Sequence, residues 1–423
     1  MSAELDEVIQ INTPLLNDIT LHENDLTEEA KNRFSYHKDI LEAFELCRRT
    51  ILENYLLTKV GRHLLLRRIV KLHADCKRVL NYVAANTEIL NHDLPTTGPL
   101  VICGLPRTGS TLLHNLLACD PNCRAPLLTD MCIECAPPIP RSNTIEHERR
   151  MLATIDETQL CEQLVGRKHV TVESHPKFII EEDYNVLQQT GVVITLVYLS
   201  ALTQTEIGKW IYDEKNKTFT YDYQKTFLRM LNIADAPKSH WVLKSPEHSL
   251  YLDLLFAQYP DAAVIMTHRR LDEVLPSFCR MSWIFDNIYF HKDDSLARAT
   301  SATRAIQHID KMIERIVEYR TRSFHSHSTP HKTIFDVDYN DLAEQPIATV
   351  RRIYDHFNLS WSEEFEKAMN AWLRANPQGK QGRHRYSLDE YGLTIEEIET
   401  RYADYNRLFL RSCQPLQTAF ISD

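Results

Sequence analysis

The residues with the clearest chemical potential form the stretch GLPRTGST, residues 104–111, directly after the apolar run 99–103. Its glycines, Gly104 and Gly109, have the interval found in a nucleoside-triphosphate loop, which reads G-x-x-x-x-G-K-[ST]. In such a loop the lysine contacts the β- and γ-phosphates and the hydroxyl residue holds Mg²⁺. Here the position of the lysine is taken by Ser110. The sequence therefore predicts an anion-binding loop without the group that holds a γ-phosphate.

The predicted loop joins a strand to a helix, so several backbone N–H groups and the positive end of the helix dipole face the anion. Further donors at the same place come from the side chains of Arg107, Thr108, Ser110 and Thr111. A later strand-like run ends in residues 268–270, His-Arg-Arg, which repel Mg²⁺ and attract a second anion. Ligands of open α/β sheets bind beyond the carboxyl ends of the strands, where both motifs are expected. Two anion sites on one crevice predict a nucleotide with phosphates at two ends, and no metal.

Strand-like and helical segments alternate around these motifs, which predicts βαβ units and a mainly parallel sheet. Strands are expected near residues 99–103, 240–245, 262–268 and 332–340, each followed by a helical pattern. Residues 1–97 have helical periodicity, as do most of residues 144–235. We therefore expect an α/β domain over residues 98–423, a helical N-terminal region packed on it, and a helical insertion at 144–235 that forms a lid or substrate wall.

Composition limits the class of protein. The chain has 423 residues, of which 43% are hydrophobic and 25% charged, as in ordinary folded soluble proteins. A formal net charge of −10 argues against broad nucleic-acid binding, although a local basic pocket remains compatible with it.

Targeting and redox signals are weak. The stretch MSAELDEVIQINTPLL has neither a basic nor an apolar segment of a secretory signal. The longest apolar stretch, residues 191–203, is shorter than the roughly 18–20 residues that a membrane span needs. Cys132 and Cys135 form a single CxxC, which by itself is insufficient for a redox or metal site. A soluble protein of a reducing, cytoplasmic compartment is expected.

Four stretches together resemble the sulfotransferases that use 3′-phosphoadenosine 5′-phosphosulfate (PAPS), in their divergent, helix-rich group. GLPRTGSTLLHNLLACDP resembles the 5′-phosphosulfate loop of that family. LKSPEHSLYLDLLFAQYPDA and VIMTHRRLDEVLPSF resemble its catalytic and 3′-phosphate segments, and TIFDVDYNDLAEQPIATVRRIYDHF resembles the next strand and helix. NPQGKQGRHRYSLDEYGL resembles the carboxyl-terminal cofactor loop. The resemblance implies a P-loop-type three-layer α/β fold with a mainly parallel sheet, and sulfuryl transfer from PAPS to a hydroxyl, or less favourably an amine, of a small or lipidic acceptor.

The resemblance also explains the missing lysine, because a sulfuryl group carries less charge than a γ-phosphoryl group and needs no Mg²⁺. Arg107 matches a basic residue that would stabilise the bridging oxygen and the departing 5′-phosphate. Arg269 and Ser277 match the arginine and serine that bind the 3′-phosphate, a role that suits the bidentate guanidinium. Tyr339 matches a tyrosine near the adenine, with a core tyrosine as the alternative.

In the last loop, Gly382 keeps the glycine spacing of the family, counted from Gly379. The usual Arg-Lys before it is replaced by Pro377-Gln378, so the resemblance assigns the lost charge to Arg383, with Lys380 and Arg385 as alternatives.

The general base is less directly implied, because common cytosolic sulfotransferases have a histidine in Lys-Thr-His. Here the sequence after the second strand is Lys-Ser-Pro-Glu-His, so that His248 stands four positions after Lys244, two further than the histidine of Lys-Thr-His. In the divergent group a glutamate also works with this histidine, and residues 181–183, Glu-Glu-Asp, match it. We expect His248 to act as the base with Glu182, while Lys244 neutralises the bridging oxygen. His175 is the next candidate, and a solvated helix face is the structural alternative for Glu182.

Two other functions remain open. A nucleotide-dependent kinase would need Mg²⁺ and a loop lysine, and the sequence offers no clear signal for either. A non-catalytic nucleotide-binding protein would have lost the base or Arg107, and both are present. The expected partner is a small-molecule or lipid acceptor, which the apolar and aromatic residues of 184–223 would line, rather than nucleic acid. A homodimer is compatible with the sequence.

Overall fold

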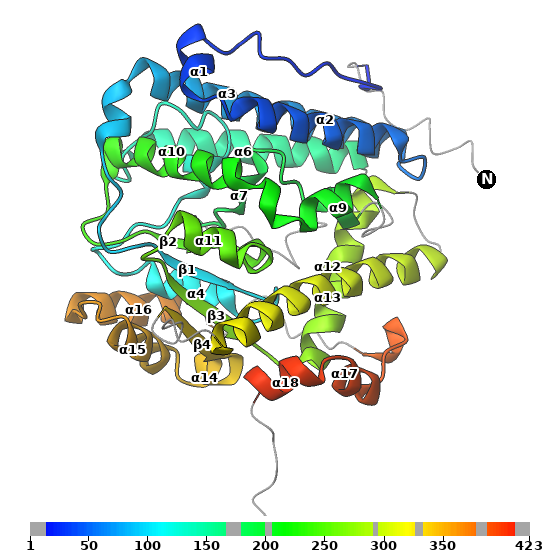
Figure 1. Ribbon diagram of the computed structural model, residues 1–423, viewed down its shortest axis with the longest axis vertical. Coiled ribbons are helices and arrows are strands. Elements are labelled where there is room, and N and C mark those ends of the chain that lie inside the picture. Colours follow the sequence, from blue (N-terminus) through cyan, green and yellow to red (C-terminus); the bar gives the residue numbers. More distant parts are fainter. Residues whose placement is uncertain are drawn as a thin grey trace, which may run out of the picture.

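The computed structural model describes residues 14–165, 179–198, 205–290, 295–325, 333–377 and 387–410. A parallel sheet lies at its centre, with helices on both faces (Figure 1). Its strands, in the order β2-β1-β3-β4 across the sheet, are β1 (Leu100–Gly104), β2 (Val242–Lys244), β3 (Ala263–His268) and β4 (Ile334–Asp338). Each neighbouring pair is parallel. The predicted α/β fold is confirmed, with the strands close to their expected positions.

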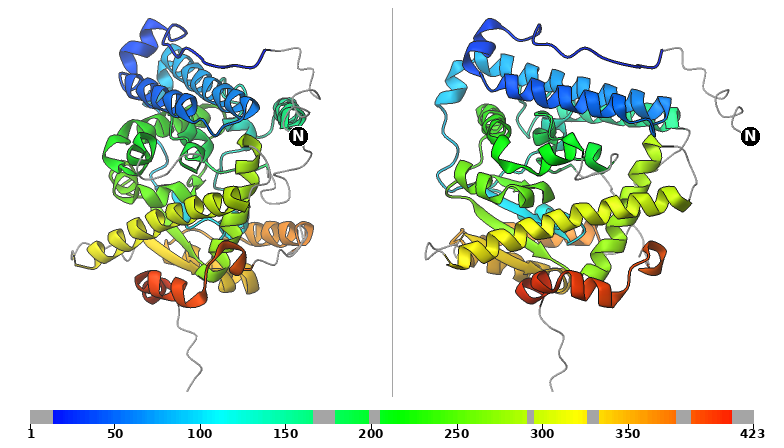
Figure 2. Two further views of the ribbon diagram at one scale, coloured as in Figure 1. Left: turned by 90° about the vertical axis from the view of Figure 1, so that its right-hand side faces the viewer. Right: turned by 45° about the vertical axis from the view of Figure 1, so that its right-hand side comes forward.

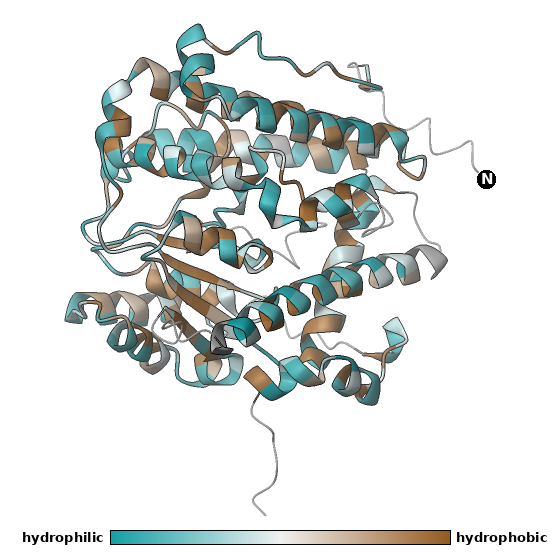
Figure 3. Cartoon of the chain, viewed as in Figure 1, coloured by the Kyte–Doolittle hydropathy of each residue, from teal (hydrophilic) through white to brown (hydrophobic). Residues whose placement is uncertain are grey.

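Alternation of side chains along the strands creates two cores, because successive residues of a strand face opposite sides of the sheet. Val101 and Cys103 belong to one buried cluster, and Leu100 and Ile102 to the other. The strands are hydrophobic along their length, as Figure 3 shows in brown. A sheet buried on both faces needs such continuous apolar strands, which is why short runs such as 99–103 were recognisable in the sequence.

Helices cover the two faces of the sheet. The smaller cluster packs under α4 (Ser110–Leu117), α14 (Tyr339–Glu344), α15 (Pro346–His356) and α16 (Glu363–Ala375). The larger cluster packs under α10 (Thr218–Asp235), α11 (Leu252–Gln258), α12 (Leu271–Tyr289) and α13 (Ser295–His325), with η3 (Pro246–Leu250) leading into α11. The carboxyl-terminal helices α17 (Ile395–Arg401) and α18 (Ala403–Phe409) lie against α12 and α13.

The N-terminal helices form a further layer beyond α10, at the end of the molecule opposite α17 and α18 (Figures 1 and 2). They are α1 (Glu28–Arg33), α2 (His37–Glu53) and α3 (Lys59–Ala85), followed by η1 (Thr87–Asn91). The remaining elements are α5 (Leu128–Met131), α6 (Thr144–Val165), α7 (Tyr184–Gln188), α8 (Thr195–Tyr198), α9 (Glu206–Tyr212), η2 (Glu214–Asn216) and η5 (Asp389–Tyr391). The division of the chain into a separate N-terminal region and a domain from residue 98 stays a prediction.

The strand register brings the carboxyl ends of all four strands to one edge of the sheet. Gly104 of β1 pairs with Thr267 of β3, and Ile102 pairs with Lys244 of β2. His268, the last residue of β3, pairs with Asp338 of β4. The segments that follow these residues therefore meet at this edge, where the sequence predicted the ligand.

None of the helices in the described ranges is both long and apolar enough to cross a membrane. Cys132 and Cys135 are free thiols.

Candidate active site

The loop between β1 and α4 is a tight turn that opens toward the edge of the sheet. Gly104, Arg107 and Gly109 have φ angles of 112°, 68° and 87°, a region in which glycine has no steric cost. A Cβ atom on Gly109 would lie 2.9 Å from the Cδ2 atom of Tyr339. Thr108 is buried and its hydroxyl donates to the carbonyl of Leu105 at 2.6 Å. The turn leads directly into α4, which begins at Ser110, and the role of this helix start as an anion site stays a prediction.

Residues from three other segments surround this loop. The Nε atom of Arg107 donates to the Ser277 hydroxyl of α12 at 3.0 Å. Nη1 of Arg269 donates to the carbonyl of Arg107 at 3.2 Å, and its guanidinium lies 4.0 Å from the centre of the Tyr339 ring. Arg269 also pairs with Glu273 in the next turn, with 2.7 Å between Nε and Oε2. The structure therefore brings together Arg107, Arg269, Ser277 and Tyr339, whose individual roles stay predictions.

Lys244 ends β2 beside the same loop and is held by two consecutive carboxylates. Its Nζ atom forms an ion pair with Glu182, although only 3% of the lysine side chain is exposed. Its backbone N–H donates to Asp183 Oδ1 at 2.7 Å. The segment before α7 thus fixes both ends of this lysine.

Asp183, rather than Glu182, is the acidic partner of His248. Nε2 of His248 lies 3.0 Å from Asp183 Oδ2, which also accepts from Gln224 Nε2 at 2.6 Å. A carboxylate only accepts, so Nε2 carries the proton and Nδ1 accepts from the Tyr221 hydroxyl at 2.8 Å. Burial alone would raise the pKa of Asp183, but the interaction with His248 and the hydrogen bond from the Lys244 backbone N–H hold the pKa below its ordinary value. The expected pairing of His248 with Glu182 does not form, because the neighbouring side chains of 182 and 183 face different surroundings.

A cavity of ≈ 300 Å³ opens beside the loop. Its reactive end is formed by Pro106, Arg107, Ser110 and Thr111, with Glu181, Glu182, Pro246 and Glu247. Its walls include Leu128, Tyr184, Asn185 and four residues of α12, Phe278, Met281, Ser282 and Phe285, with Arg68, Gln188, Thr195 and His308. His248 is fully buried and is not among the lining residues. The cavity therefore has a polar end at the glycine loop and a largely apolar wall.

Glu247 is the residue that sequence reasoning passed over. Its Oε2 atom accepts from the Ser245 hydroxyl at 2.6 Å, and its backbone N–H donates to the same hydroxyl at 3.2 Å. Burial, together with the neighbouring Glu182 carboxylate, raises the pKa of Glu247 to about 7. A carboxyl group with this pKa on a cavity can exchange protons at neutral pH. The sequence contained a signal for Glu247, since this residue directly precedes His248. Only the structure shows that Glu247 lines the cavity whereas His248 is fully buried.

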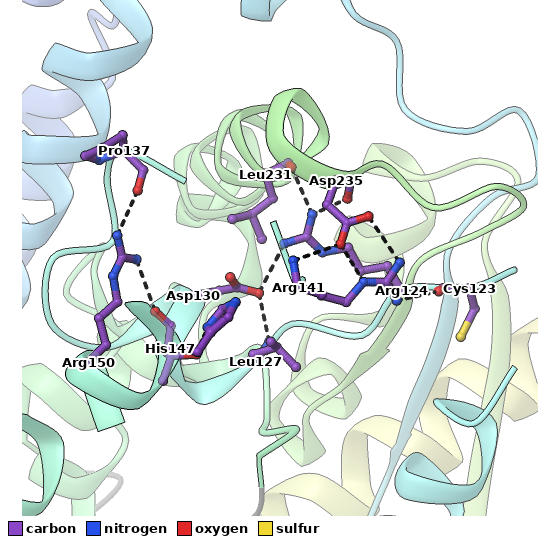
Figure 4. A network of polar contacts seen from close by, with 11 residues as sticks. Cys123, Arg124, Leu127, Asp130, Pro137, Arg141, His147, Arg150, Leu231 and Asp235 are labelled. Carbon is purple, nitrogen blue, oxygen red and sulfur yellow. Dashed lines mark hydrogen bonds and ion pairs between the residues drawn. The ribbon is translucent and has the colours of Figure 1, made fainter. Parts of the chain in front are cut away.

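A buried polar network fixes the wall that carries Leu128 (Figure 4). Asp130 Oδ2 accepts from the Leu127 N–H at 3.0 Å and from Arg124 Nη2 at 3.3 Å. Arg124 Nη1 donates to the carbonyl of Leu231 at 2.9 Å, which ties α5 to α10. Both side chains of the Arg124–Asp130 pair are fully buried. A buried ion pair therefore fixes this wall in addition to hydrophobic packing.

Some predicted residues lie outside the described ranges. They are Gly382 and Arg383, their neighbours Gly379, Lys380 and Arg385, and the alternative base His175. Among the described residues, no group of three or more His, Cys, Asp or Glu side chains is placed to hold a metal ion.

Comparison with known proteins agrees with this geometry. The model of the sulfotransferase family matches residues 99–363. Omega-hydroxy-beta-dihydromenaquinone-9 sulfotransferase Stf3 of Mycobacterium bovis is 23% identical over 320 residues, which cover 71% of each chain. The crystal structure of sulfotransferase STF9 from Mycobacterium avium matches with a TM-score of 0.75 and 24% identity over 92% of this chain and 98% of that one. Sulfotransferase STF1 from Mycobacterium tuberculosis H37Rv matches with a TM-score of 0.66 and 24% identity, over 90% and 94%. At these identities the two structures establish a shared fold.

Proposed function

The chain belongs to the sulfotransferase family, and on this premise we propose that it transfers the sulfuryl group of PAPS to a hydroxyl of a small or lipidic acceptor. The observation that carries the proposal is the meeting of Arg107, Arg269 and Lys244 at the glycine loop, beside an apolar-walled cavity. The name of the Stf3 relative, which specifies a hydroxylated menaquinone, supports a lipidic acceptor.

The donor set suits a nucleotide with phosphates at both ends. The Arg269 guanidinium donates to the backbone carbonyl of Arg107, and the Arg107 guanidinium donates to the Ser277 hydroxyl. Charge-assisted bonds from such groups are the usual means of binding phosphate. We assign the 5′-phosphosulfate to the loop with Arg107 and Lys244, and the 3′-phosphate to Arg269 and Ser277. PAPS itself supplies the activated sulfuryl group.

In the proposed reaction the acceptor oxygen forms a bond to sulfur, and the bond between sulfur and the 5′-phosphate oxygen breaks with its electron pair on phosphate. The positive charges of Arg107 and Lys244 stabilise the charge that develops there. The hydroxyl proton passes to a carboxylate oxygen of Glu247, which we propose as the base because it lines the cavity and has a pKa near 7. His248, whose ring nitrogens are bonded to Asp183 and Tyr221, is the second candidate.

The first prediction separates a sulfotransferase from a kinase. The product 3′-phosphoadenosine 5′-phosphate is expected to raise the melting temperature, because a ligand of the native state stabilises it. ATP with Mg²⁺ should raise it much less, because the loop carries Ser110 where a kinase loop has lysine. Thermal unfolding with each nucleotide at equal concentration measures the difference. Equal shifts would favour the kinase, and PAPS binding without turnover on any acceptor would favour a non-catalytic protein.

The second prediction tests the 3′-phosphate site. Arg269→Ala is expected to weaken binding of 3′-phosphoadenosine 5′-phosphate by about 1.5–3 kcal/mol, the scale of a charge-assisted hydrogen bond. Arg270→Ala is the matched control, because Arg270 is exposed and paired with Asp272. Titration calorimetry measures both. An unchanged dissociation constant in Arg269→Ala would place the 3′-phosphate elsewhere.

A further inference from the structure

The cavity has a cation at the end opposite the phosphate loop. Arg68 of α3 lines it, and its guanidinium donates to the side chains of Gln188 and Thr195, the latter at 3.4 Å. The Tyr289 hydroxyl is its other hydrogen-bonding neighbour. All three are neutral groups, and within the described ranges Arg68 forms no ion pair with a carboxylate. A half-buried guanidinium with only neutral neighbours favours a negative ligand group, because a charge removed from water is costly unless it is paired.

Helix α12 shows that this cation lies at the far end. Ser277 near its beginning contacts Arg107 of the phosphate loop, at 3.0 Å. Tyr289, its last residue, contacts α3, because the Thr58 N–H donates to its carbonyl at 3.0 Å. The helical rise places the backbones of Ser277 and Tyr289 about 18 Å apart along the axis, while the Arg68 guanidinium contacts the hydroxyl at the tip of the Tyr289 side chain. Arg68 therefore lies toward the carboxyl end of α12, and Arg107 lies toward its beginning.

Between the two ends α12 presents one continuous stripe to the cavity. Phe278, Met281, Ser282 and Phe285 follow one another at the i, i+3, i+4, i+7 spacing of a single helix face. Three of the four are large apolar side chains, which would lie along a hydrocarbon body. The three cavity carboxylates are at the other end, where Glu182 pairs with Lys244 and Glu247 bonds Ser245.

We infer that the acceptor is a hydroxylated carboxylic acid with an apolar body, whose carboxylate binds the Arg68 guanidinium while its distant hydroxyl lies at Glu247. Sulfuryl transfer to the hydroxyl rests on the proposed function. Binding of the carboxylate at Arg68 does not depend on it. Arginine is suited to this contact, since its planar fork binds both carboxylate oxygens.

The test uses 10-hydroxydecanoate, its methyl ester and 1-decanol as probes, with shorter and longer hydroxy acids to find the best length. Arg68→Gln is expected to lower kcat/KM for 10-hydroxydecanoate about 10–100-fold, the scale of a lost charge-assisted contact. Turnover of 1-decanol and of the ester should change less than about 2-fold, since neither carries the charge. Arg67→Gln, next to it on α3 but exposed, is the control that should change neither.

Binding separates this inference from the proposed function. Calorimetric titration of 10-hydroxydecanoate into the protein loaded with 3′-phosphoadenosine 5′-phosphate should show the same loss in Arg68→Gln, and Arg68→Lys should retain part of the affinity. Arg68-dependent binding without turnover of any probe would support the carboxylate site and overturn sulfuryl transfer. Equal affinity in the wild type and Arg68→Gln, or an equal effect on the acid and its ester, would overturn the inference.

Discussion

Glu247→Gln is expected to lower turnover about 10²–10⁴-fold, the usual contribution of a general base. The substitution keeps the size of the side chain and an oxygen for the Ser245 hydroxyl, but it removes the group that accepts the proton. Affinity for 3′-phosphoadenosine 5′-phosphate should be nearly unchanged, because Glu247 faces the acceptor. In the wild type, kcat/KM should rise with pH through a value near 7, as Glu247 loses its proton.

His248→Gln provides the comparison that decides between the two candidate bases. If Glu247 is the base, the Glu247 variant should lose both its activity and the rise near pH 7, whereas the His248 variant should keep that rise at a lower level. Full activity of Glu247→Gln together with loss of activity in His248→Gln would return the assignment to His248. If Glu247 and His248 act as a unit, the double variant should be little less active than the less active single variant.

Glu247→Gln should also change the stability of the fold, independently of its effect on turnover. Folding raises the pKa of Glu247 from 4.5 to about 7, so the folded state binds more protons than the unfolded state in this window. The contribution of Glu247 to the stability of the wild type is therefore lost as the pH rises through this window. Because glutamine does not ionise, Glu247→Gln should be more stable than the wild type at pH 8, by on the order of 3 kcal/mol at about 1.4 kcal/mol per pKa unit. At pH 4 the difference should vanish, which urea unfolding at both pH values would measure.

Asp183→Asn is expected to cost about 3–5 kcal/mol of unfolding free energy, because it removes a buried charged acceptor whose hydrogen bonds are each worth about 1.5–3 kcal/mol. Asp183 is fully buried and accepts from the Lys244 N–H, Gln224 and His248. An asparagine offers one acceptor oxygen and would turn its NH₂ group toward one of these donors. The loss should also release Lys244 and lower turnover.

Asp253→Asn is the matched control for this charge removal. Asp253 is exposed and paired with Arg322 on the surface, so its loss should cost less than about 1 kcal/mol. Chemical unfolding of both variants measures the difference. A cost for Asp183→Asn as small as that of the control would mean that the buried pair with His248 contributes nothing.

Much of the fold could be read from local patterns. The strand at 99–103 and the glycine loop were recognisable because a doubly covered strand is continuously apolar, and because the turn needs residues that tolerate positive φ. The carboxyl-end rule then placed Arg269 opposite Arg107, which the structure brings within one hydrogen bond. These features depend on neighbouring residues in the chain and on the geometry shared by all parallel sheets.

The roles of consecutive acidic residues could not be read in this way. Residues 181–183 precede α7 in an irregular segment without a fixed period, so no spacing rule says which carboxylate faces inward. Tertiary packing turns Asp183 toward His248 and leaves Glu182 on Lys244. The sequence therefore predicted contact between this acidic cluster and the histidine, but the member in contact is Asp183 rather than Glu182.

The sequence by itself indicated the parallel sheet and the glycine loop, because both follow from residue types at fixed local spacing, and its resemblance to the sulfotransferases is confirmed by the family model. Only the tertiary structure decided that His248 is sealed behind Asp183, that Glu247 lines the cavity, and that Arg68 of a helix before the first strand reaches the same cavity. Burial and the approach of distant charges set these properties, and both arise from packing between segments that are remote in the chain.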